Sequence, residues 1–157
     1  VIPPDAKNVH YEGELVIVIG RRCRRASRAE AEAAVFGYTC GNDLTARDVQ
    51  KTDLQWTRAK GFDTSAPLGP WIETELDTED LQIQGRLNGE LRQDGSTSQM
   101  IRGVRELVSI VSQAFTLLPG DVIMTGTPAG VGLVSAGDRF EVEIEGIGRL
   151  SNPIVRR

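Results

Sequence analysis

Acidic side chains at two places in the chain have the types and spacing of a metal site. Glu12 and Glu14 flank Gly13 at the start of an apolar run, and Asp43 lies in a later polar stretch. On a strand, residues two apart point to the same side, so both glutamates would face one spot. Three carboxylates without an accompanying Cys or His pair are hard oxygen ligands, which suit Mg²⁺, Mn²⁺ or Ca²⁺ rather than Zn²⁺ or copper. The alternative for Glu12 and Glu14 is a solvated strand end.

Basic and amide side chains follow Asp43 at spacings that would bring them close to it. A helical turn starting near Asp43 would place Arg47 at i+4 and Gln50 at i+7 on the same face. The alternative is an Asp cap followed by a surface helix with one ion pair. Lys60, between Ala59 and a glycine, is either a solvated side chain or a cation that reaches into a carboxylate-rich pocket.

A glycine-rich segment, Thr125–Gly132, could contribute backbone N–H groups to a binding site. It lacks the Gly-Lys-Ser/Thr ending of a phosphate-binding loop and the spacing of a dinucleotide-binding fingerprint, which disfavours nucleotide binding. Its N–H groups and hydroxyls could still hold a substrate carboxylate. His10, the single histidine, is expected outside the ligand set, because a hard cation held by three carboxylates does not need it.

The elements around the first two carboxylates are predicted from local patterns. The β-branched run Leu15–Ile19 predicts a strand that is buried on both faces. Ser27 and Glu30 have the spacing of a capping box, which predicts a short helix that continues to Phe36 and ends at Gly37. Residues 41–66 show no clear period, and a long irregular stretch in a compact domain is either functional or contains elements that the pattern does not reveal.

The second half of the chain predicts further strands and one helix. The dipeptide at 88–89, Asn-Gly, predicts a hairpin between a strand that starts at Leu81 and a return strand that starts at Leu91. Apolar residues spaced by three or four predict an amphipathic helix over 104–115. Strands are also expected at 122–125 and 140–144. The sum is a mostly β protein with α-helices, arranged as a mixed β-sandwich or roll.

Composition excludes several classes of protein. The 157 residues fit one domain, and 18 basic against 22 acidic residues give a net charge of −4, which argues against a surface built for nucleic acid. We therefore expect Arg21–Arg25 to be a solvated loop. No apolar stretch is long enough for a membrane span, so no membrane partner is expected. Cys23 and Cys40 are too few for a disulfide scaffold, which favours a reducing, cytoplasmic setting.

Six segments, in order from about residue 9 to 153, resemble the fumarylacetoacetate hydrolase family. The sequence of residues 55–63 is most similar to the bacterial isomerase and decarboxylase members of that family. The segments are Tyr11–Gly20, Gly37–Gln50, Lys60–Asp63, Pro67–Pro70, Asn88–Glu90 and Leu118–Pro128.

The resemblance implies a fold and a set of site residues. The fold is the mixed β-sandwich roll of the family's C-terminal domain, usually in a homodimer. Positions that match the family's site residues are Glu12, Glu14 and Asp43 as ligands of Mg²⁺ or Mn²⁺, Arg47 and Gln50 as substrate contacts, Arg47 and Lys60 as catalytic cations, and Thr127 as a partner of the substrate carboxylate.

The resemblance also implies an activity. We expect a single catalytic domain over 1–157 that acts on a small anionic 2-oxo or 2-hydroxydienoic dicarboxylate from aromatic catabolism, by isomerisation or decarboxylation through an enolate. The alternatives are an acylpyruvate or fumarylacetoacetate type C–C hydrolase, an oxaloacetate decarboxylase, and a metal-binding homologue without activity. Family members usually carry a mobile lid with a His–Glu pair before the Glu-x-Glu strand. Only eleven residues precede Glu12, so the lid is expected to lie outside this sequence.

Overall fold

Antiparallel strands are the predominant regular structure of the computed structural model, which describes residues 1–156. The first sheet has the strand order β5 (Leu68–Glu73), β3 (Val35–Asn42), β2 (Gly13–Ile19), β8 (Val122–Met124). The second has the order β11 (Gly148–Pro153), β10 (Arg139–Ile144), β6 (Gln82–Leu87), β7 (Glu90–Ser96). A third, small sheet has the order β4 (Thr45–Ala46), β1 (Val9–Tyr11), β9 (Gly132–Leu133). The predicted mixed β-sandwich is confirmed.

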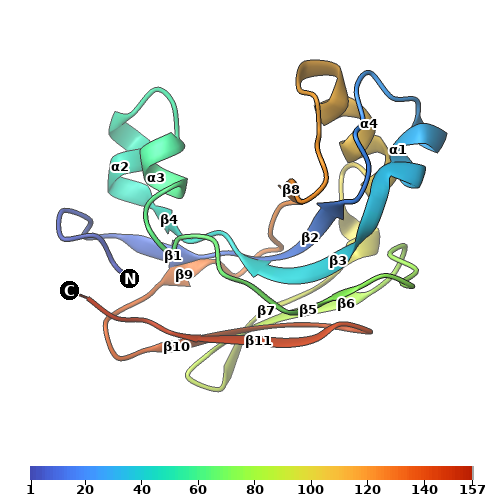
Figure 1. The fold of residues 1–157 in the computed structure, drawn as a ribbon. Coiled ribbons are helices and arrows are strands. Elements are labelled where there is room, and N and C mark those ends of the chain that lie inside the picture. Colours follow the sequence, from blue (N-terminus) through green and yellow to red (C-terminus); the bar gives the residue numbers. More distant parts are fainter. Residues whose placement is uncertain (157) are drawn as a thin grey trace.

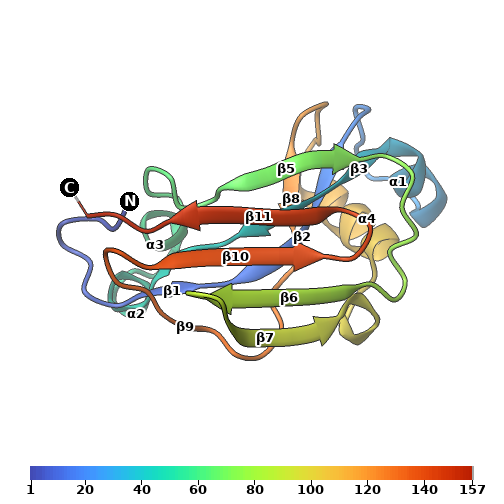
Figure 2. The same ribbon diagram turned by 90° about the horizontal axis from the view of Figure 1, so that it is seen from below.

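The helices stand at the two ends of the first sheet. Figure 1 shows α2 (Arg47–Thr52) and α3 (Thr57–Lys60) at one end, and α1 (Arg28–Ala34) and α4 (Val104–Ala114) at the other. A short 3₁₀ turn, Thr97–Gln99, follows β7. The strands of the second sheet lie side by side on the opposite surface (Figure 2). Among the residues that the structure describes, no helix is long and apolar enough to cross a membrane.

The core lies between the two large sheets. Leu15, Ile17 and Ile19 belong to it, together with Phe140 and Val142 of the second sheet. The even-numbered residues of β2 point to the other face, since side chains alternate along a strand. Every residue of β2 is nevertheless buried, so the predicted strand with two buried faces is confirmed.

The first helix begins as predicted but ends earlier. The capping box is present, because Ser27 Oγ accepts the Glu30 N–H and the Glu30 carboxylate accepts the Ser27 N–H. The prediction that the helix continues to Phe36 and ends at Gly37 is wrong, since both residues belong to β3. A Cβ on Gly37 would lie 2.5 Å from the Glu73 carbonyl oxygen of β5. The glycine therefore allows a close approach of two strands.

The predicted hairpin is confirmed. Asn88 and Gly89 both have positive φ angles, 53° and 84°, as a two-residue turn of this type requires. The return strand begins at Glu90, one residue before the predicted start. The predicted amphipathic helix is α4, and the two remaining predicted strands are β8 and β10.

Candidate active site

A one-residue break between β1 and β2 carries the first carboxylate. Glu12 belongs to neither strand, and its backbone N–H donates to Oδ1 of Asn42 at 2.9 Å. The next N–H, that of Gly13, donates to Oε1 of Gln93 at 3.0 Å. The Glu12 carbonyl oxygen accepts the N–H of Asp43 at 2.8 Å. The buried side-chain amides of Asn42 and Gln93 thus fix the backbone between β1 and β2, and Glu12 lies beside Asp43.

The structure brings the three predicted carboxylates together. One carboxylate oxygen from each of Glu12, Glu14 and Asp43 lies within 4.8 Å of the other two. Glu12 and Glu14 are 7% and 2% exposed, so both side chains are largely out of water. Placing this much negative charge in a small buried volume is unfavourable unless cations compensate it.

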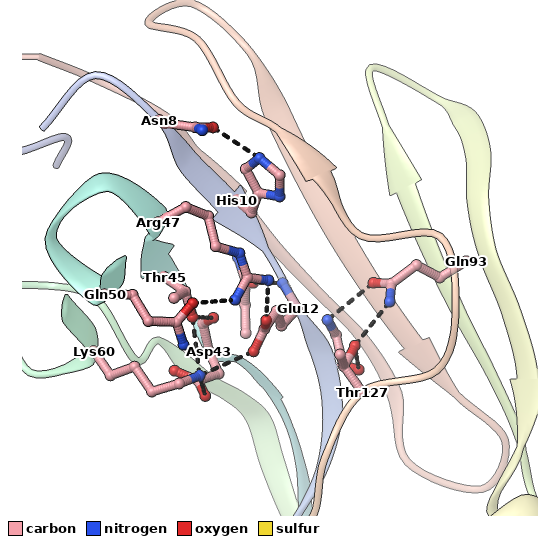
Figure 3. Close-up of polar contacts among 12 residues, drawn as sticks. Asn8, His10, Glu12, Asp43, Thr45, Arg47, Gln50, Lys60, Gln93 and Thr127 are labelled. Atoms are coloured by element: carbon pink, nitrogen blue, oxygen red, sulfur yellow. Dashed lines mark hydrogen bonds and ion pairs between the residues drawn. The ribbon is translucent and has the colours of Figure 1, made fainter. Parts of the chain in front are cut away.

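Lys60, at the end of α3, supplies one of the compensating cations. Its Nζ lies 3.0 Å from Oε2 of Glu12, forms a close ion pair with Asp43, and donates to Oγ1 of Thr45 at 2.9 Å (Figure 3). Burial alone would lower the pKa of Lys60, but the hydrogen bonds to Asp43 and Glu12 outweigh it and the pKa is raised. The lysine is therefore a firmly charged ammonium at neutral pH.

Arg47, the first residue of α2, is the second cation. It forms a close ion pair with Oε1 of Glu12, and its second terminal nitrogen donates to Oε1 of Gln50 at 3.0 Å (Figure 3). The hypothesis of a helical turn that starts near Asp43 is wrong, because β4 intervenes and the helix begins only at Arg47. Arg47 and Gln50 still share a helix face, because residues three apart are neighbours on a helix.

The carboxylate oxygens around Glu14 are suited to a hard divalent cation. Burial raises the pKa of Glu14 to about 7, while the Gly126 N–H, which donates to Oε2 at 2.7 Å, lowers it and the charges of Asp43 and Glu12 raise it. Burial likewise raises the pKa of Asp43, against the hydrogen bond and charge of Lys60. Across residues 1–156, no lysine or arginine forms an ion pair with Glu14. The cluster thus contains a buried carboxylate that lacks a cation, with oxygen ligands of the kind that Mg²⁺ and Mn²⁺ prefer.

The glycine-rich segment packs directly against the carboxylates. Thr127 Oγ1 donates to the Gly13 carbonyl oxygen at 2.8 Å and accepts from Nε2 of Gln93 at 2.8 Å. Gly126 has a φ of +97° and directs its N–H at Glu14. The structure therefore places Thr127 next to the carboxylate-bearing strand, and its role toward a substrate carboxylate stays a prediction.

His10 lies on β1 beside the site. Its Nε2 is 2.8 Å from Oδ1 of Asn8, and its buried Nδ1 has no hydrogen-bond partner in the part of the chain that is described. Burial and the charge of Arg47 lower its pKa. The described His, Cys, Asp and Glu residues close enough to share one ion do not include His10, and its place outside the ligand set stays a prediction.

Three site residues escaped the analysis of the sequence. Asn42 and Thr45 flank Asp43, and a search for polar side chains on both sides of a candidate ligand would have found them. Gln93 lies fifty residues further on, in a hairpin strand whose other residues are mostly exposed. No local pattern in the sequence identifies it as a site residue.

Comparison with known proteins assigns the chain to a family. Residues 1–155 match the family model of the fumarylacetoacetate (FAA) hydrolase C-terminal domain. The chain spans 60 to 63% of the length of curated relatives that are 52 to 53% identical to it.

Named relatives carry different activities. An oxaloacetate tautomerase of Bacillus subtilis is 45% identical over 92% of this chain and 51% of its own. The structure of a 2-hydroxyhepta-2,4-diene-1,7-dioate isomerase from Mycobacterium marinum is 54% identical, with a TM-score of 0.97 over 99% of this chain and 62% of its own. A fumarylpyruvate hydrolase from Pseudomonas aeruginosa, solved with Mn²⁺ and pyruvate, is 38% identical, with a TM-score of 0.92 over 99% of this chain and 70% of its own. The chain belongs to the fumarylacetoacetate hydrolase family.

Proposed function

We propose that the chain is the catalytic domain of a Mg²⁺- or Mn²⁺-dependent enzyme that isomerises or decarboxylates small 2-oxo or 2-hydroxydienoic dicarboxylates of aromatic catabolism through an enolate. The observation that carries the proposal is the buried cluster of Glu12, Glu14 and Asp43, next to two cations. The isomerase from Mycobacterium marinum and the Mn²⁺ and pyruvate of the Pseudomonas structure support it.

The proposed chemistry needs positive charge where negative charge develops. A bound Mg²⁺ or Mn²⁺ would supply Lewis-acid polarisation to a 2-oxo acid that chelates it. When the bond to a departing CO₂ or proton breaks, its electron pair moves to the oxygen on C2 of the substrate. The Lys60 ammonium, which lies beside Glu12 and Asp43, suits stabilisation of that oxygen.

The remaining predicted residues would bind and orient the substrate. Arg47 is held by Glu12 and Gln50, and its planar guanidinium suits a second carboxylate of the substrate. The backbone N–H groups at and next to Thr127 offer a place for the carboxylate nearest to the reacting carbon, since the Thr127 hydroxyl already donates to the Gly13 carbonyl oxygen. The positive charge of Lys60 and Arg47 would also favour the entry of a dianion.

Three alternatives belong to the same site. A C–C hydrolase of acylpyruvates is supported by the fumarylpyruvate hydrolase relative, and it needs a positioned water and a base. Action on oxaloacetate, as a decarboxylase or a tautomerase, is supported by the Bacillus subtilis relative. A metal-binding homologue without activity would bind the ion and turn over no substrate.

Turnover assays with three substrates test the proposal. Oxaloacetate, an acylpyruvate and 2-hydroxyhepta-2,4-dienedioate are each followed by ultraviolet absorbance, with Mg²⁺ or Mn²⁺ and with EDTA. We expect metal-dependent consumption of the dienedioate. Consumption of the acylpyruvate or oxaloacetate alone would select that alternative, and metal binding without turnover would select the inactive homologue. If the metal neither raises the melting temperature nor supports turnover, the three carboxylates do not form a metal site.

We also propose that the enzyme is a cytoplasmic homodimer. Exposed apolar side chains on the outer face of the first sheet, opposite the core, support the dimer; they include Leu68, Ile72 and Val122. The two cysteines are unpaired and buried, which fits a reducing compartment. Light scattering of the parent and of Val122→Lys tests the dimer: we expect a dimeric parent and a monomeric variant, and a monomeric parent would contradict it.

A further inference from the structure

We propose that Gln93 is a positioning residue, which fixes the Glu12–Glu14 segment and the Thr125–Gly130 loop relative to each other and thereby sets the geometry of the metal site. The inference rests on the proposed function in one respect, namely that the carboxylates bind a divalent cation. Gln93 itself touches none of the three carboxylate groups in any hydrogen bond of the described residues.

A β-bulge turns Gln93 into the protein. In the pairing of β6 with β7, Gly85 faces Gln93 but Arg86 faces Leu91, so Arg92 is an extra residue on β7. Gln93 is 1% exposed, whereas its neighbours on both sides are exposed. Bulges redirect a side chain at the edge of a sheet, and β7 is an edge strand of its sheet.

The inward amide connects three segments of the chain. Oε1 accepts the N–H of Gly13 at 3.0 Å, and Nε2 donates to Oγ1 of Thr127 at 2.8 Å (Figure 3). Nε2 also donates to the carbonyl oxygen of Pro128 at 2.9 Å. Both amide hydrogens and one acceptor position are thus used. A glutamine is the one side chain of this length that offers an acceptor on one side and two donors on the other.

Nearby glycines leave room for this side chain. A Cβ on Gly13 would lie 3.2 Å from Oε1 of Gln93, and a Cβ on Gly85 would lie 2.8 Å from it. Gly130, at a φ of +102°, lets the loop approach β7 so closely that a Cβ would lie 2.0 Å from the Arg92 carbonyl oxygen. Three glycines from different parts of the chain therefore shape one site for the amide.

The contacts of Gln93 lead directly to the carboxylates. Gly13 is the residue between Glu12 and Glu14, so a shift of its N–H moves both ligands. The loop that Gln93 holds through Thr127 also directs the Gly126 N–H at Glu14. Residues that orient metal ligands without touching the metal change its affinity by about 10- to 100-fold when they are replaced.

A purely structural role is the competing explanation, because any buried glutamine stabilises a fold through its hydrogen bonds. A control variant separates the two roles. Thr97 lies just beyond β7, is 7% exposed, and its Oγ1 accepts the Leu81 N–H at 2.7 Å; among the described residues its side chain makes no hydrogen bond to the carboxylates or to the Thr125–Gly130 loop. Thr97→Val therefore leaves one buried donor unpaired in the same region, as Gln93→Met does at Gly13.

The experiment measures Mn²⁺ affinity by calorimetry and melting temperature for the parent, Gln93→Met, Gln93→Asn and Thr97→Val. The asparagine variant keeps an amide but is one methylene too short to reach Gly13 and Pro128 together, and it decides the matter if the methionine variant does not fold. We expect all variants to melt at lower temperature, and only the Gln93 variants to bind Mn²⁺ about 10-fold or more weakly. Affinities within twofold of the parent would overturn the inference.

A second measurement separates this inference from the proposed function. If the parent binds no Mn²⁺, the proposed function fails, and amide hydrogen exchange then decides the role of Gln93. We expect Gln93→Asn to speed exchange in peptides that cover 11–16 and 125–131 relative to Thr97→Val. Unchanged exchange in those peptides would overturn the inference whatever the outcome for the metal.

Discussion

The two ends of the first sheet both carry clustered charges, but only one end removes them from water. Next to α2 and α3, the side chains of Lys60, Asp43 and Glu12 are 28%, 14% and 9% exposed. At the other end, Arg105 of α4 and Glu32 of α1 form an ion pair at 59% and 53% exposure. Exposed pairs contribute about 0–1 kcal/mol, whereas removing one member of a buried pair costs about 3–5 kcal/mol. Taking these charges out of water also carries a desolvation penalty that can exceed their mutual attraction. The buried charges are therefore kept at a cost in stability, which is expected of a binding site.

The arginine-rich loop lies at the exposed end and forms hydrogen bonds to the C-terminus of α4. The expectation of a solvated loop fits the four arginines of 21–25, all of which are exposed. Arg24 donates to the carbonyl oxygens of Ser112 at 2.9 Å and Gln113 at 2.6 Å, in the last turn of α4. Carbonyl groups there lack helical partners, and the negative end of the helix dipole favours a cation.

The largest effect is expected from Asp43→Asn. The substitution keeps the size of the side chain but removes a ligand and the close partner of Lys60. We expect Mn²⁺ binding about 100-fold weaker or more, and turnover at background. Calorimetry and the turnover assay check this, with Glu32→Gln at the exposed end as a control that changes neither. Metal-independent turnover by Asp43→Asn would remove Asp43 from the site.

The Lys60→Met variant distinguishes an effect on metal binding from an effect on the chemical step. The Lys60 ammonium pairs with Glu12 and Asp43 and therefore competes with a bound cation for these carboxylates. The variant should bind Mn²⁺ as tightly as the parent or more tightly. Turnover should fall by about 100- to 1,000-fold, the cost of losing one group that stabilises an oxyanion. The matched control is Lys51→Met, an exposed lysine on α2. An unchanged kcat would exclude Lys60 from the mechanism.

The dependence of stability on pH tests how strongly Glu14 is buried. Its pKa is about 7 in the folded protein against 4.5 ordinarily, so the folded state binds more protons between these values. The metal-free protein should therefore lose roughly 3 kcal/mol of unfolding free energy as pH rises from about 4 to 8, relative to Glu14→Gln. Urea unfolding in EDTA measures this. Mn²⁺ should stabilise the parent more at pH 8 than at pH 5, and identical pH profiles for the two proteins would contradict the burial argument.

Much of the fold follows from signals that are local in the sequence. The capping box at Ser27, the Asn-Gly turn at 88–89 and the apolar period of α4 each depend on residues within a few positions, and the structure contains all three. The end of α1 could not be predicted in this way. Gly37 looks like a helix terminator, but a glycine is required there because the Glu73 carbonyl oxygen of β5, far along the chain, approaches it closely.

The same distinction between local signals and long-range contacts applies to the candidate site. Glu12, Glu14 and Asp43 could be grouped from their chemistry and from the family resemblance, and the structure brings their oxygens together. Gln93 could not be found, because its inward direction depends on a bulge that exists only when β7 pairs with β6. Residues that supply chemistry are recognisable by type, whereas residues that hold them are recognisable only by contact.

The smallest effect is expected at the exposed end, in the ion pair of Arg105 and Glu32. In a double-mutant cycle of Arg105→Ala and Glu32→Ala, the coupling free energy should stay below about 1 kcal/mol and shrink further in 0.5 M salt, because water and ions screen both side chains. The same cycle at Lys60→Met and Asp43→Asn should give a larger coupling that salt changes little, because those side chains are mostly buried. Urea unfolding in EDTA measures both cycles. Equal coupling at the two ends would mean that burial does not distinguish them, and the case for treating the carboxylate cluster as a site would then rest on metal binding alone.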